Sequence, residues 1–316
     1  MTARLQIRFA GPHVSVQDGG RPGLARFGVP QSGPMDRTAL AAANLALGNP
    51  AGAACIEVSL GGLTLECREG QVSFAIAGGG FIVEHAGRKS GAWQVATLRA
   101  GEILTLRPGP WGAWCYLAFA GDLQAPTWLN SRATHSQSGF GGGKLTTGGT
   151  VDIAAPRLVP HLAPDAPLPC PPFVRPLREI RATLGPQDRF FTPDQIAALE
   201  GAVWRMSGAY DRMGVRLSGP KLPPDAPLDM PSEPVARGSV QVAGDGVATV
   251  LLADHQTTGG YPKIATVLDA DLDRFAQLRP GEAFQFRLVS PAEAVAHARL
   301  MARLRTTWLA SLGRQR

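Results

Sequence analysis

The sequence predicts a mainly β protein, a β-rich α+β fold with a few short helices. Glycine (38 residues) and proline (27 residues) are abundant and follow no collagen-like period, which favours many short strands joined by turns. Hydrophobic residues make up 44% of the chain and charged residues 18%, so the chain can bury a sizeable core and is not disordered. A length of 316 residues suits one large domain or two ordinary ones.

The first half contains one helix among many strand-like segments. Residues 5–9 alternate as an opening strand, and an alanine-rich helix is expected at 37–47. Asp36 is a candidate N-cap for this helix; alternatively Ser32, Gly33 and the free N–H groups of the helix start bind an anion. Short apolar runs separated by glycine turns follow at 56–60, 72–77, 81–85, 103–106 and 114–120. Their regular spacing suggests a barrel or a sandwich.

A proline-rich segment at 156–176 has the composition of a linker. We therefore expect an N-terminal domain over 1–155, a C-terminal domain over 177–290 and a terminal helix over 291–316. The second domain is expected to contain a helix at 192–199, with Thr192 as its cap and Pro193 at its first position. Asp271 is expected to cap a further short helix that ends at Gln277. Strands are predicted at 177–184, 239–242, 247–252, 264–268 and 283–289.

The most distinctive stretch is ADHQTTGGYPKIA, at residues 253–265, between two of these strands. A carboxylate, Asp254, ends the first strand, and two threonines, two glycines and Lys263 follow it. Paired glycines allow positive φ and bring backbone N–H groups close to a ligand. A polar loop fixed by strands on both sides suits binding or catalysis, although an ordinary glycine-containing turn explains the composition equally well.

Composition disfavours several functional classes. The formal net charge is +6, but the basic residues are scattered and no aromatic residues interleave with them, which argues against nucleic acid binding. No apolar run is long enough to cross a bilayer and no secretory leader is recognised, so a soluble cytoplasmic protein is expected. Cys55 and Cys115 are expected to be buried free thiols. The six histidines are dispersed without ligand spacing, so no metal site is predicted.

Several motifs, spread in order over nearly the whole chain, resemble those of one family. They are SVQDGGRPG at 15–23, GVPQSGPMD at 28–36, ANL at 43–45, LGPQ at 184–187, DRMG at 211–214, and the stretch from 254 to 263 with ADL at 270–272. With these motifs the chain resembles the allophanate hydrolase subunit 2 family, also called the biotin-dependent carboxyltransferase or KipA-like family. The family includes the C subunit of ATP-dependent 5-oxoprolinase. The resemblance implies two cyclophilin-like β-barrel domains.

The resemblance also implies partners and three functional hypotheses. Members pair with a smaller, KipI-like B subunit and form with it the cleft in which an activated carboxyl group is handled. In the first hypothesis, the chain acts with the B subunit and an A subunit, uses ATP as co-substrate and opens 5-oxoproline to glutamate. In the second, it is a carboxyltransferase component that moves a carboxyl group from carboxybiotin to urea or a related amide. In the third, it is a KipA-like regulatory protein that binds and antagonises a kinase inhibitor.

The sequence shows no phosphate loop and no biotin attachment site, so ATP is expected either at an interface with another subunit or away from this chain. The segment FGGGKL at 140–145 approaches a phosphate-loop pattern, but leucine follows Lys144 and no strand–loop–helix context is evident. Biotin would be carried by another protein, because the four lysines lack neighbours of the Met-Lys-Met type; they are Lys89, Lys144, Lys221 and Lys263.

Both enzymatic hypotheses need an anion site, a group that polarises a carbonyl, and an acid or base. The candidate catalytic residues are Asp254, Lys263, Asp211 and Arg212, with Asp254 or Asp211 as the base and the cations as electrostatic partners. Simpler alternatives remain: Asp211 and Arg212 form a structural ion pair, Lys263 is a solvated turn residue, and Asp18 only orders its own glycine loop. The expected substrate-binding residues, some of them oxyanion donors, are Arg21, Gln17, Ser32, Gln241, Thr257, Thr258, Gly259, Gly260 and Tyr261.

Overall fold

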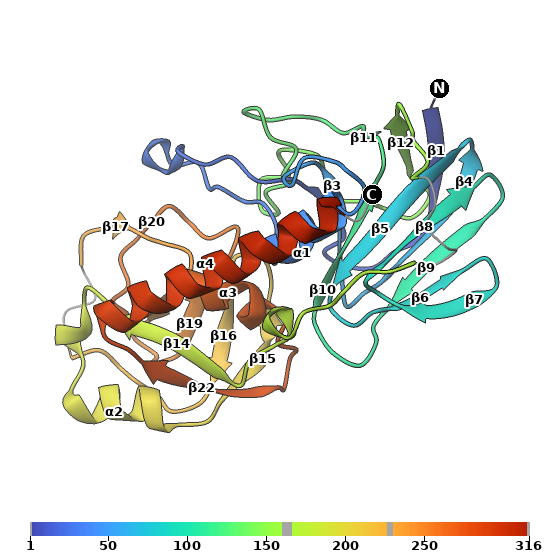
Figure 1. Ribbon diagram of the computed structural model, residues 1–316. Helices are drawn as coiled ribbons and strands as arrows, with labels where there is room; N and C mark the ends of the chain where they lie inside the picture. The colour runs from blue at the N-terminus through green and yellow to red at the C-terminus, as the bar shows by residue number, and fades with distance from the viewer. Residues whose placement is uncertain (1, 160–165, 226–229, 315–316) are drawn as a thin grey trace. The chain divides into compact units, whose positions relative to one another are not determined.

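Strands dominate the computed structural model, which describes residues 2–159, 166–225 and 230–314 (Figure 1). The predicted mainly β class is therefore confirmed. Residues 160–165 of the expected linker and 315–316 of the expected terminal helix lie outside the described residues. The helices in the described ranges are α1 (Arg37–Leu45), α2 (Pro193–Gly201), α3 (Asp269–Ala276) and α4 (Pro291–Arg314), with 3-10 turns η1 (Ala25–Phe27), η2 (Pro172–Val174) and η3 (Asp188–Phe190).

The chain forms two compact units. Unit 1 comprises Met1–Arg21, Ser32–Arg175 and Thr306–Arg316, and unit 2 comprises Pro22–Gln31 and Pro176–Arg305. The domain boundaries expected from the sequence stay a prediction. None of the helices within the described ranges combines the length and the apolar character that a bilayer span requires.

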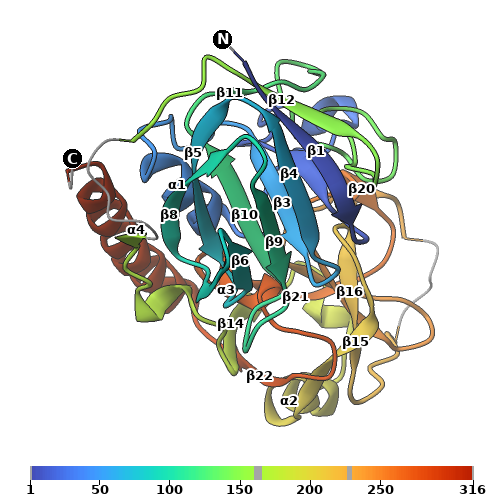
Figure 2. The same ribbon diagram turned by 90° about the vertical axis from the view of Figure 1, so that its right-hand side faces the viewer.

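Unit 1 is built from two antiparallel sheets, and Figure 2 looks onto their strands. The larger sheet has the order β11 (Asp122–Leu123), β12 (Thr150–Ala154), β1 (Thr2–Ala10), β4 (Leu63–Glu69), β9 (Ile103–Arg107), β6 (Ile82–His85) and β7 (Arg88–Gly91). The smaller sheet has the order β13 (Ala166–Pro167), β8 (Gln94–Arg99), β5 (Gln71–Gly78), β10 (Trp114–Phe119), β3 (Cys55–Ser59) and β2 (Ser15–Gln17). Residues 166–167, in the middle of the expected linker, thus contribute an edge strand.

The core of unit 1 explains its sequence patterns. In β1 the inward side chains alternate with exposed ones, because only one face of the strand meets the core; Ala3, Leu5 and Ile7 are buried. All six residues of β10 are buried, since α1 packs on β10 and β5. Cys55 and Cys115 are fully buried free thiols, as predicted, and burial raises the pKa of both well above the ordinary thiol value.

Unit 2 contains a closed barrel. Its strands follow the order β14 (Glu179–Leu184), β21 (Lys263–Val267), β18 (Ser239–Val242), β19 (Ala248–Leu251), β16 (Gly214–Ser218), β15 (Trp204–Tyr210) and β22 (Ala283–Leu288). The parallel pairing of β22 with β14 closes the ring, and the other neighbours are antiparallel. A separate two-stranded ladder joins β17 (Glu233–Pro234) to β20 (Thr258–Gly259). Buried aromatic rings in edge-to-face contact fill the barrel core: Trp204, Phe275, Phe284 and Phe286.

Two of the three predicted helix caps are confirmed. Asp36 accepts the backbone N–H of Ala39 at 2.9 Å, and Thr192 forms a capping box with Gln195. The cap predicted at Asp271 is wrong, because α3 begins at Asp269 and Leu268 is its N-cap. The fully buried Asp271 carboxylate instead accepts bonds from the backbone and guanidinium of Arg181 and contacts His297 of α4 at 3.2 Å. This carboxylate therefore ties three elements together.

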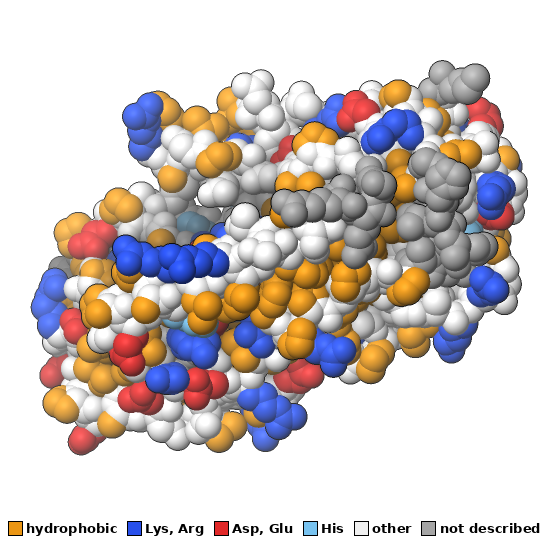
Figure 3. Space-filling model, viewed as in Figure 1, with side chains coloured by type: hydrophobic (Ala, Val, Ile, Leu, Met, Phe, Trp, Pro, Cys, Tyr) orange, Lys and Arg blue, Asp and Glu red, His pale blue; other side chains and the backbone are white. Residues whose placement is uncertain are grey.

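The terminal helix α4 packs only in part. Near its C-terminal end the Trp308 ring contacts Trp93 and Phe173 edge to face. Three of its apolar side chains are 43–54% exposed: Val295, Leu300 and Leu304. Figure 3 shows apolar atoms lying along the helix. The amphipathic pattern thus predicted the helix correctly, but not which apolar side chains it buries.

Candidate functional site

A buried ion pair joins two of the four expected catalytic residues. The guanidinium of Arg212 donates two parallel hydrogen bonds to Asp254, from Nε to Oδ2 at 3.0 Å and from Nη2 to Oδ1 at 2.9 Å. The side chains are 2% and 0% exposed. The backbone N–H of Asp254 also donates to the Arg212 carbonyl at 2.8 Å. Because the carboxylate is held on both oxygens, this geometry favours a positioning role for Asp254 over that of a free base.

The Asp211 side chain closes the turn in which it lies. Its Oδ1 accepts the backbone N–H groups of Met213 at 2.8 Å and Gly214 at 3.1 Å, and the residue is exposed. The ion pair that adjacency in sequence suggested, between Asp211 and Arg212, is replaced by the pair of Arg212 with Asp254. A side chain that closes a turn in this way is explained by local structure.

Lys263 is buried beside a carboxylate and an amide. Its side chain is 3% exposed, and Nζ lies 3.4 Å from Oε2 of Glu233, whose side chain is 44% exposed. The same Oε2 accepts a 2.6 Å bond from Nε2 of Gln187, while Oε1 of Gln187 accepts the backbone N–H of Lys263 at 3.2 Å. The alternative of a solvated turn lysine is therefore wrong. Neither Glu233 nor Gln187 was among the candidate site residues, although Gln187 belongs to the LGPQ motif at 184–187.

Gln241 lies directly opposite Lys263 in the β18–β21 ladder. Its Oε1 accepts a 3.0 Å bond from Gln256, and its Nε2 is buried with no hydrogen-bond partner among the described residues. A Cβ added to Gly259 would stand 2.8 Å from this Nε2. A buried amide end without a partner is costly, which marks it as a donor available for a ligand.

The positive φ predicted for the paired glycines of this stretch is wrong. Neither Gly259 nor Gly260 adopts a positive φ. Glycine is needed there because backbone or side-chain atoms approach closely: Nε2 of Gln241 at Gly259, and the Met230 carbonyl oxygen at 3.0 Å from a Cβ on Gly260. The other expected binding residues of this segment are more open, with Thr258 and Tyr261 exposed and Thr257 half-buried.

The remaining expected residues belong to unit 1 and form a second cluster. Nε2 of Gln17 donates to the Thr134 carbonyl and to Ser15 at 3.0 Å each, and its Oε1 is buried without a partner among the described residues. The Arg21 guanidinium stacks 4.7 Å from the centroid of Trp128 and donates to the Ala133 carbonyl. Ser32 adopts a positive φ of 54°, and its buried hydroxyl likewise lacks a partner in the described ranges. Strain at a buried polar residue is typical of binding loops.

Two carboxylates support this second cluster. Asp18 accepts bonds from the backbone N–H of Gly20 at 2.8 Å, from Ser131 at 2.6 Å and from the backbone N–H of Arg132 at 2.6 Å, which favours its structural alternative. Glu57, which sequence reasoning did not select, accepts the Met35 N–H at 2.9 Å and the Tyr116 hydroxyl at 2.8 Å. The signal was available, since Glu57 is a charge inside an apolar strand.

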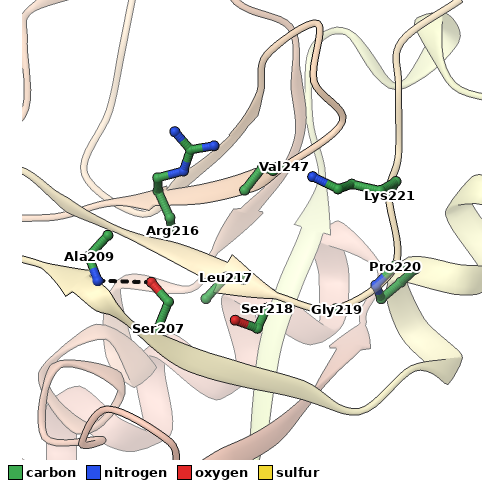
Figure 4. Close-up of a pocket in the computed structure, with 9 residues that line it drawn as sticks. All are labelled: Ser207, Ala209, Arg216, Leu217, Ser218, Gly219, Pro220, Lys221 and Val247. Atoms are coloured by element: carbon green, nitrogen blue, oxygen red, sulfur yellow. Dashed lines mark hydrogen bonds between the residues drawn. The ribbon is translucent and has the colours of Figure 1, made fainter.

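A cavity of about 370 Å³ also lies in unit 2, and Figure 4 shows its lining. It is bordered by Ser218, Lys221 and Arg216, whose guanidinium pairs with Asp245 at 2.6 Å. None of the residues expected in the functional site, all of which the structure describes, lines it. The chemistry-bearing cluster of unit 2 is therefore the one around Lys263.

Comparison with known proteins gives one consistent result. Residues 27–288 match the family described as carboxyltransferase domain, subdomain A and B. The chain is similar to the C subunit of 5-oxoprolinase from Haemophilus influenzae, at 36% identity over 89% of this chain and 90% of that protein. It is similar to the C subunit of 5-oxoprolinase from Escherichia coli, at 34% identity over 92% of this chain and 93% of that protein. A solved urea amidolyase of Kluyveromyces lactis superposes with a TM-score of 0.85 at 26% identity, over 96% of this chain and 20% of the amidolyase chain.

Proposed function

Since this chain belongs to the carboxyltransferase-domain family of subdomains A and B, we propose that it is the C subunit of an ATP-dependent 5-oxoprolinase. The observation that carries the proposal is the extent of the match. The similarity spans 90% of the Haemophilus influenzae relative, a protein of the same length class, whereas it covers only 16% of the Saccharomyces cerevisiae urea amidolyase. The proposed reaction opens the cyclic amide of 5-oxoproline to glutamate.

The cluster around Lys263 offers the groups that this reaction needs. Opening breaks the amide C–N bond, adds the hydroxyl of water to the carbonyl carbon and leaves its hydrogen on the nitrogen. Negative charge develops on the carbonyl oxygen, and buried donors stabilise such charge because they need no reorganisation. Lys263 supplies a fixed positive charge and Gln241 an amide donor. The Arg212–Asp254 pair holds the start of the loop that carries Thr257, Thr258 and Tyr261.

Asp211 fits a base less well than its residue type suggested, because two backbone N–H groups already occupy its Oδ1. The unit 1 residues Gln17, Arg21 and Ser32 are proposed as additional binding groups. The buried polar atoms of Gln17 and Ser32 and the Arg21–Trp128 stack support a site for a polar ligand there.

ATP is proposed as a co-substrate of the complex, and no step on this chain is routed through it. The glycines of the FGGGKL segment serve packing: a Cβ on Gly141 would overlap the Ala133 carbonyl oxygen, and one on Gly142 would lie 2.7 Å from Cβ of Val16. In the described residues 145–159 no helix follows Lys144, so the segment does not present the helix N-terminus of a phosphate loop. The residues present therefore do not fit a nucleotide phosphate site at this position.

The second candidate is a carboxyltransferase component acting on urea or a related amide. It is supported by the superposition on the Kluyveromyces lactis urea amidolyase over 96% of this chain. In this case carboxybiotin would be delivered by a separate carrier. The donors Lys263 and Gln241 would then stabilise charge on the carboxyl group in transfer.

We further propose that the chain works in the cytoplasm with a KipI-like B subunit and an A subunit. Four cysteines remain free thiols, and Cys55, Cys67 and Cys115 are buried, which suits a reducing compartment. The names of the Haemophilus influenzae and Escherichia coli relatives, each a subunit of an enzyme, support a heteromeric complex.

The test is reconstitution. The chain is co-purified with its B and A subunits, and ATP-dependent formation of glutamate from 5-oxoproline is measured. Omission of this chain is the control and should abolish turnover. A complex that forms no glutamate but carboxylates urea when given carboxybiotin would overturn the proposal in favour of the second candidate.

A further inference from the structure

We propose that the Glu233 carboxylate occupies the anion-binding position beside Lys263 when no substrate is bound. A substrate carboxylate displaces it and binds at the same position. This inference deepens the proposed function and rests on it for the identity of the substrate. It assigns to the cluster around Lys263 a substrate class, a small acid that also carries an amide carbonyl. It also assigns an autoinhibitory contact to the two-residue strand β17.

Strand pairing brings the four residues of this position together. Glu233 of β17 lies opposite Gly259 of β20, and Gln241 of β18 lies opposite Lys263 of β21. Residues paired directly across an antiparallel ladder have Cα atoms about 4.5–5.5 Å apart. Nζ of Lys263 lies 3.4 Å from Oε2 of Glu233, and Gly259 lies so close to Gln241 that a Cβ built on it would stand 2.8 Å from Nε2.

The two groups that donate to Glu233, on Lys263 and Gln187, are buried and held in place, whereas the accepting Glu233 carboxylate is partly exposed. Lys263 and Gln187 are 3% and 2% exposed, and the Gln187 amide is oriented because its Oε1 accepts the backbone N–H of Lys263. The NH₂ end of Gln187 must then face Oε2 of Glu233. Glu233 is 44% exposed and stands on a strand of two residues with one partner strand. A short, solvent-exposed ladder opens at low free-energy cost, so Glu233 is the member that moves.

A buried ammonium group requires an anion. Desolvation makes an unpaired buried charge highly unfavourable, so Lys263 keeps a carboxylate beside it in either state. Exchange of one carboxylate for another preserves the charge balance of the cluster. A neutral ligand would leave the lysine without its counter-charge, which selects for acids.

Gln241 adds the second recognition element. Its Oε1 accepts from Gln256, and its buried Nε2 has no hydrogen-bond partner among the described residues. Gly259 lies against this donor, because a Cβ there would stand only 2.8 Å from Nε2 and would clash with it. The buried Nε2, which has no hydrogen-bond partner among the described residues, is therefore a donor that a carbonyl oxygen can accept from. A carboxylate at Lys263 and Gln187 with a carbonyl at Gln241 describes a cyclic or linear amide acid.

The first experiment measures the dissociation constant of 5-oxoproline and of 2-pyrrolidinone, the same ring without the carboxylate, for the full-length chain and its variants by calorimetry. Removal of the internal competitor in Glu233→Ala should tighten 5-oxoproline binding about tenfold. Binding of 2-pyrrolidinone should not tighten. Glu179→Ala is the matched control, because Glu179 makes a similar 3.4 Å contact with Arg287 at 53% exposure and lies outside the cluster.

The second experiment does not depend on the substrate. Acylation of Lys263 by acetic anhydride is followed by mass spectrometry, with and without formate as a carboxylate probe. We expect faster labelling in Glu233→Ala than in the parent chain, and formate should restore protection in that variant but not alter it in Glu179→Ala. Unchanged labelling in Glu233→Ala, or labelling insensitive to formate, overturns the inference.

The two experiments separate the inference from the proposed function. If 5-oxoproline neither binds nor is turned over while formate protects Lys263 in Glu233→Ala, the proposed substrate is wrong and the anion exchange stands. If 5-oxoproline is turned over but Glu233→Ala binds it more weakly than the parent, Glu233 is a structural partner and the exchange is wrong.

Discussion

Arg212 and Asp254 form a bidentate ion pair that solvent hardly reaches, at 2.9 and 3.0 Å. Arg212 belongs to the turn between β15 and β16, and Asp254 follows β19. The pair therefore links two connections of the barrel that are far apart in sequence. Its stability consequence follows from burial, since removing one member leaves the other charge desolvated without its counter-ion.

Substitution of this pair should unfold unit 2 at lower denaturant concentration. We expect Arg212→Ala to lower the free energy of unfolding by about 3–5 kcal/mol. The matched control is Arg216→Ala, which removes an ion pair with Asp245 whose partners are 54% and 49% exposed. That change should cost less than about 1 kcal/mol. Urea titration followed by tryptophan fluorescence measures both, and equal small losses would contradict a role for the buried pair.

Loss of the Lys263 charge should affect turnover. In the reconstituted complex we expect Lys263→Met to lower kcat/KM for 5-oxoproline by about 100- to 1,000-fold, because the buried cation that holds the substrate carboxylate and stabilises negative charge at the neighbouring carbonyl is removed. The circular dichroism spectrum should stay unchanged. Lys221→Met is the control, since Lys221 is exposed and borders the other cavity. Turnover equal to that of the parent would remove Lys263 from the site.

Replacement of Gly185 by alanine should destabilise unit 2. A Cβ there would overlap the carbonyl oxygen of Lys263, while the Gly185 N–H donates to the Ile264 carbonyl at 2.8 Å. We expect Gly185→Ala to cost about 1–3 kcal/mol. Gly208→Ala is the control, because a Cβ at Gly208 meets no atom within 4 Å. Thermal unfolding compares them, and a neutral Gly185→Ala would show that the two backbones can separate without loss.

Removal of the Tyr116 hydroxyl, with the ring retained, should lower the stability of unit 1. The hydroxyl accepts the Asp36 N–H at 2.7 Å and donates to Glu57 at 2.8 Å, in full burial. Tyr116→Phe removes a partner from each and should cost about 1–3 kcal/mol. Tyr261→Phe, at a ring that is 50% exposed, should be close to neutral. Denaturant unfolding distinguishes them; indistinguishable midpoints would contradict the role of the hydroxyl.

His255 should make stability sensitive to mild acid. Burial is the main cause that lowers the His255 pKa from its ordinary value, while the Gln256 carbonyl opposes the shift by accepting from Nδ1 at 2.6 Å. Because the folded pKa lies below the unfolded one, the unfolded chain takes up the proton first as pH falls. The stabilisation is complete above about pH 6.5 and decreases below it. Melting temperatures at about pH 7.5 and pH 5 should fall further apart in the parent than in His255→Gln.

Local patterns predicted much of the fold. The strand expected at 239–242 coincides with β18, and Asp36 and Thr192 cap their helices because capping depends on neighbours within a few residues. Strands such as β7, which carries Arg88, Lys89 and Ser90, were missed because a solvated edge strand has no apolar alternation. Asp271 was misassigned for the opposite reason: its position suits a cap, but a distant arginine binds it.

The candidate site was less accessible to sequence reasoning than the fold. Residue types at 254 and 263 were sufficient to select Asp254 and Lys263. Their partners depend on tertiary pairing, and Arg212 bonds a carboxylate 42 positions away although Asp211 is its neighbour. Glu233 lies in a proline-containing segment with no apolar period, so only the ladder to β20 reveals that it reaches Lys263.

The order of the strands in the barrel determines when unit 2 can complete its folding during synthesis. β14 pairs in parallel with β22, so the first strand of the ring waits for the last one to leave the ribosome. The intervening stretch of roughly 100 residues takes about 5–20 s to translate, and one edge of β14 stays unpaired throughout. Exposed strand edges attract other chains. Nascent chains that stall before Ala283 should therefore be preferred clients of ribosome-associated chaperones, whereas chains that have passed Leu288 can close the ring and escape them.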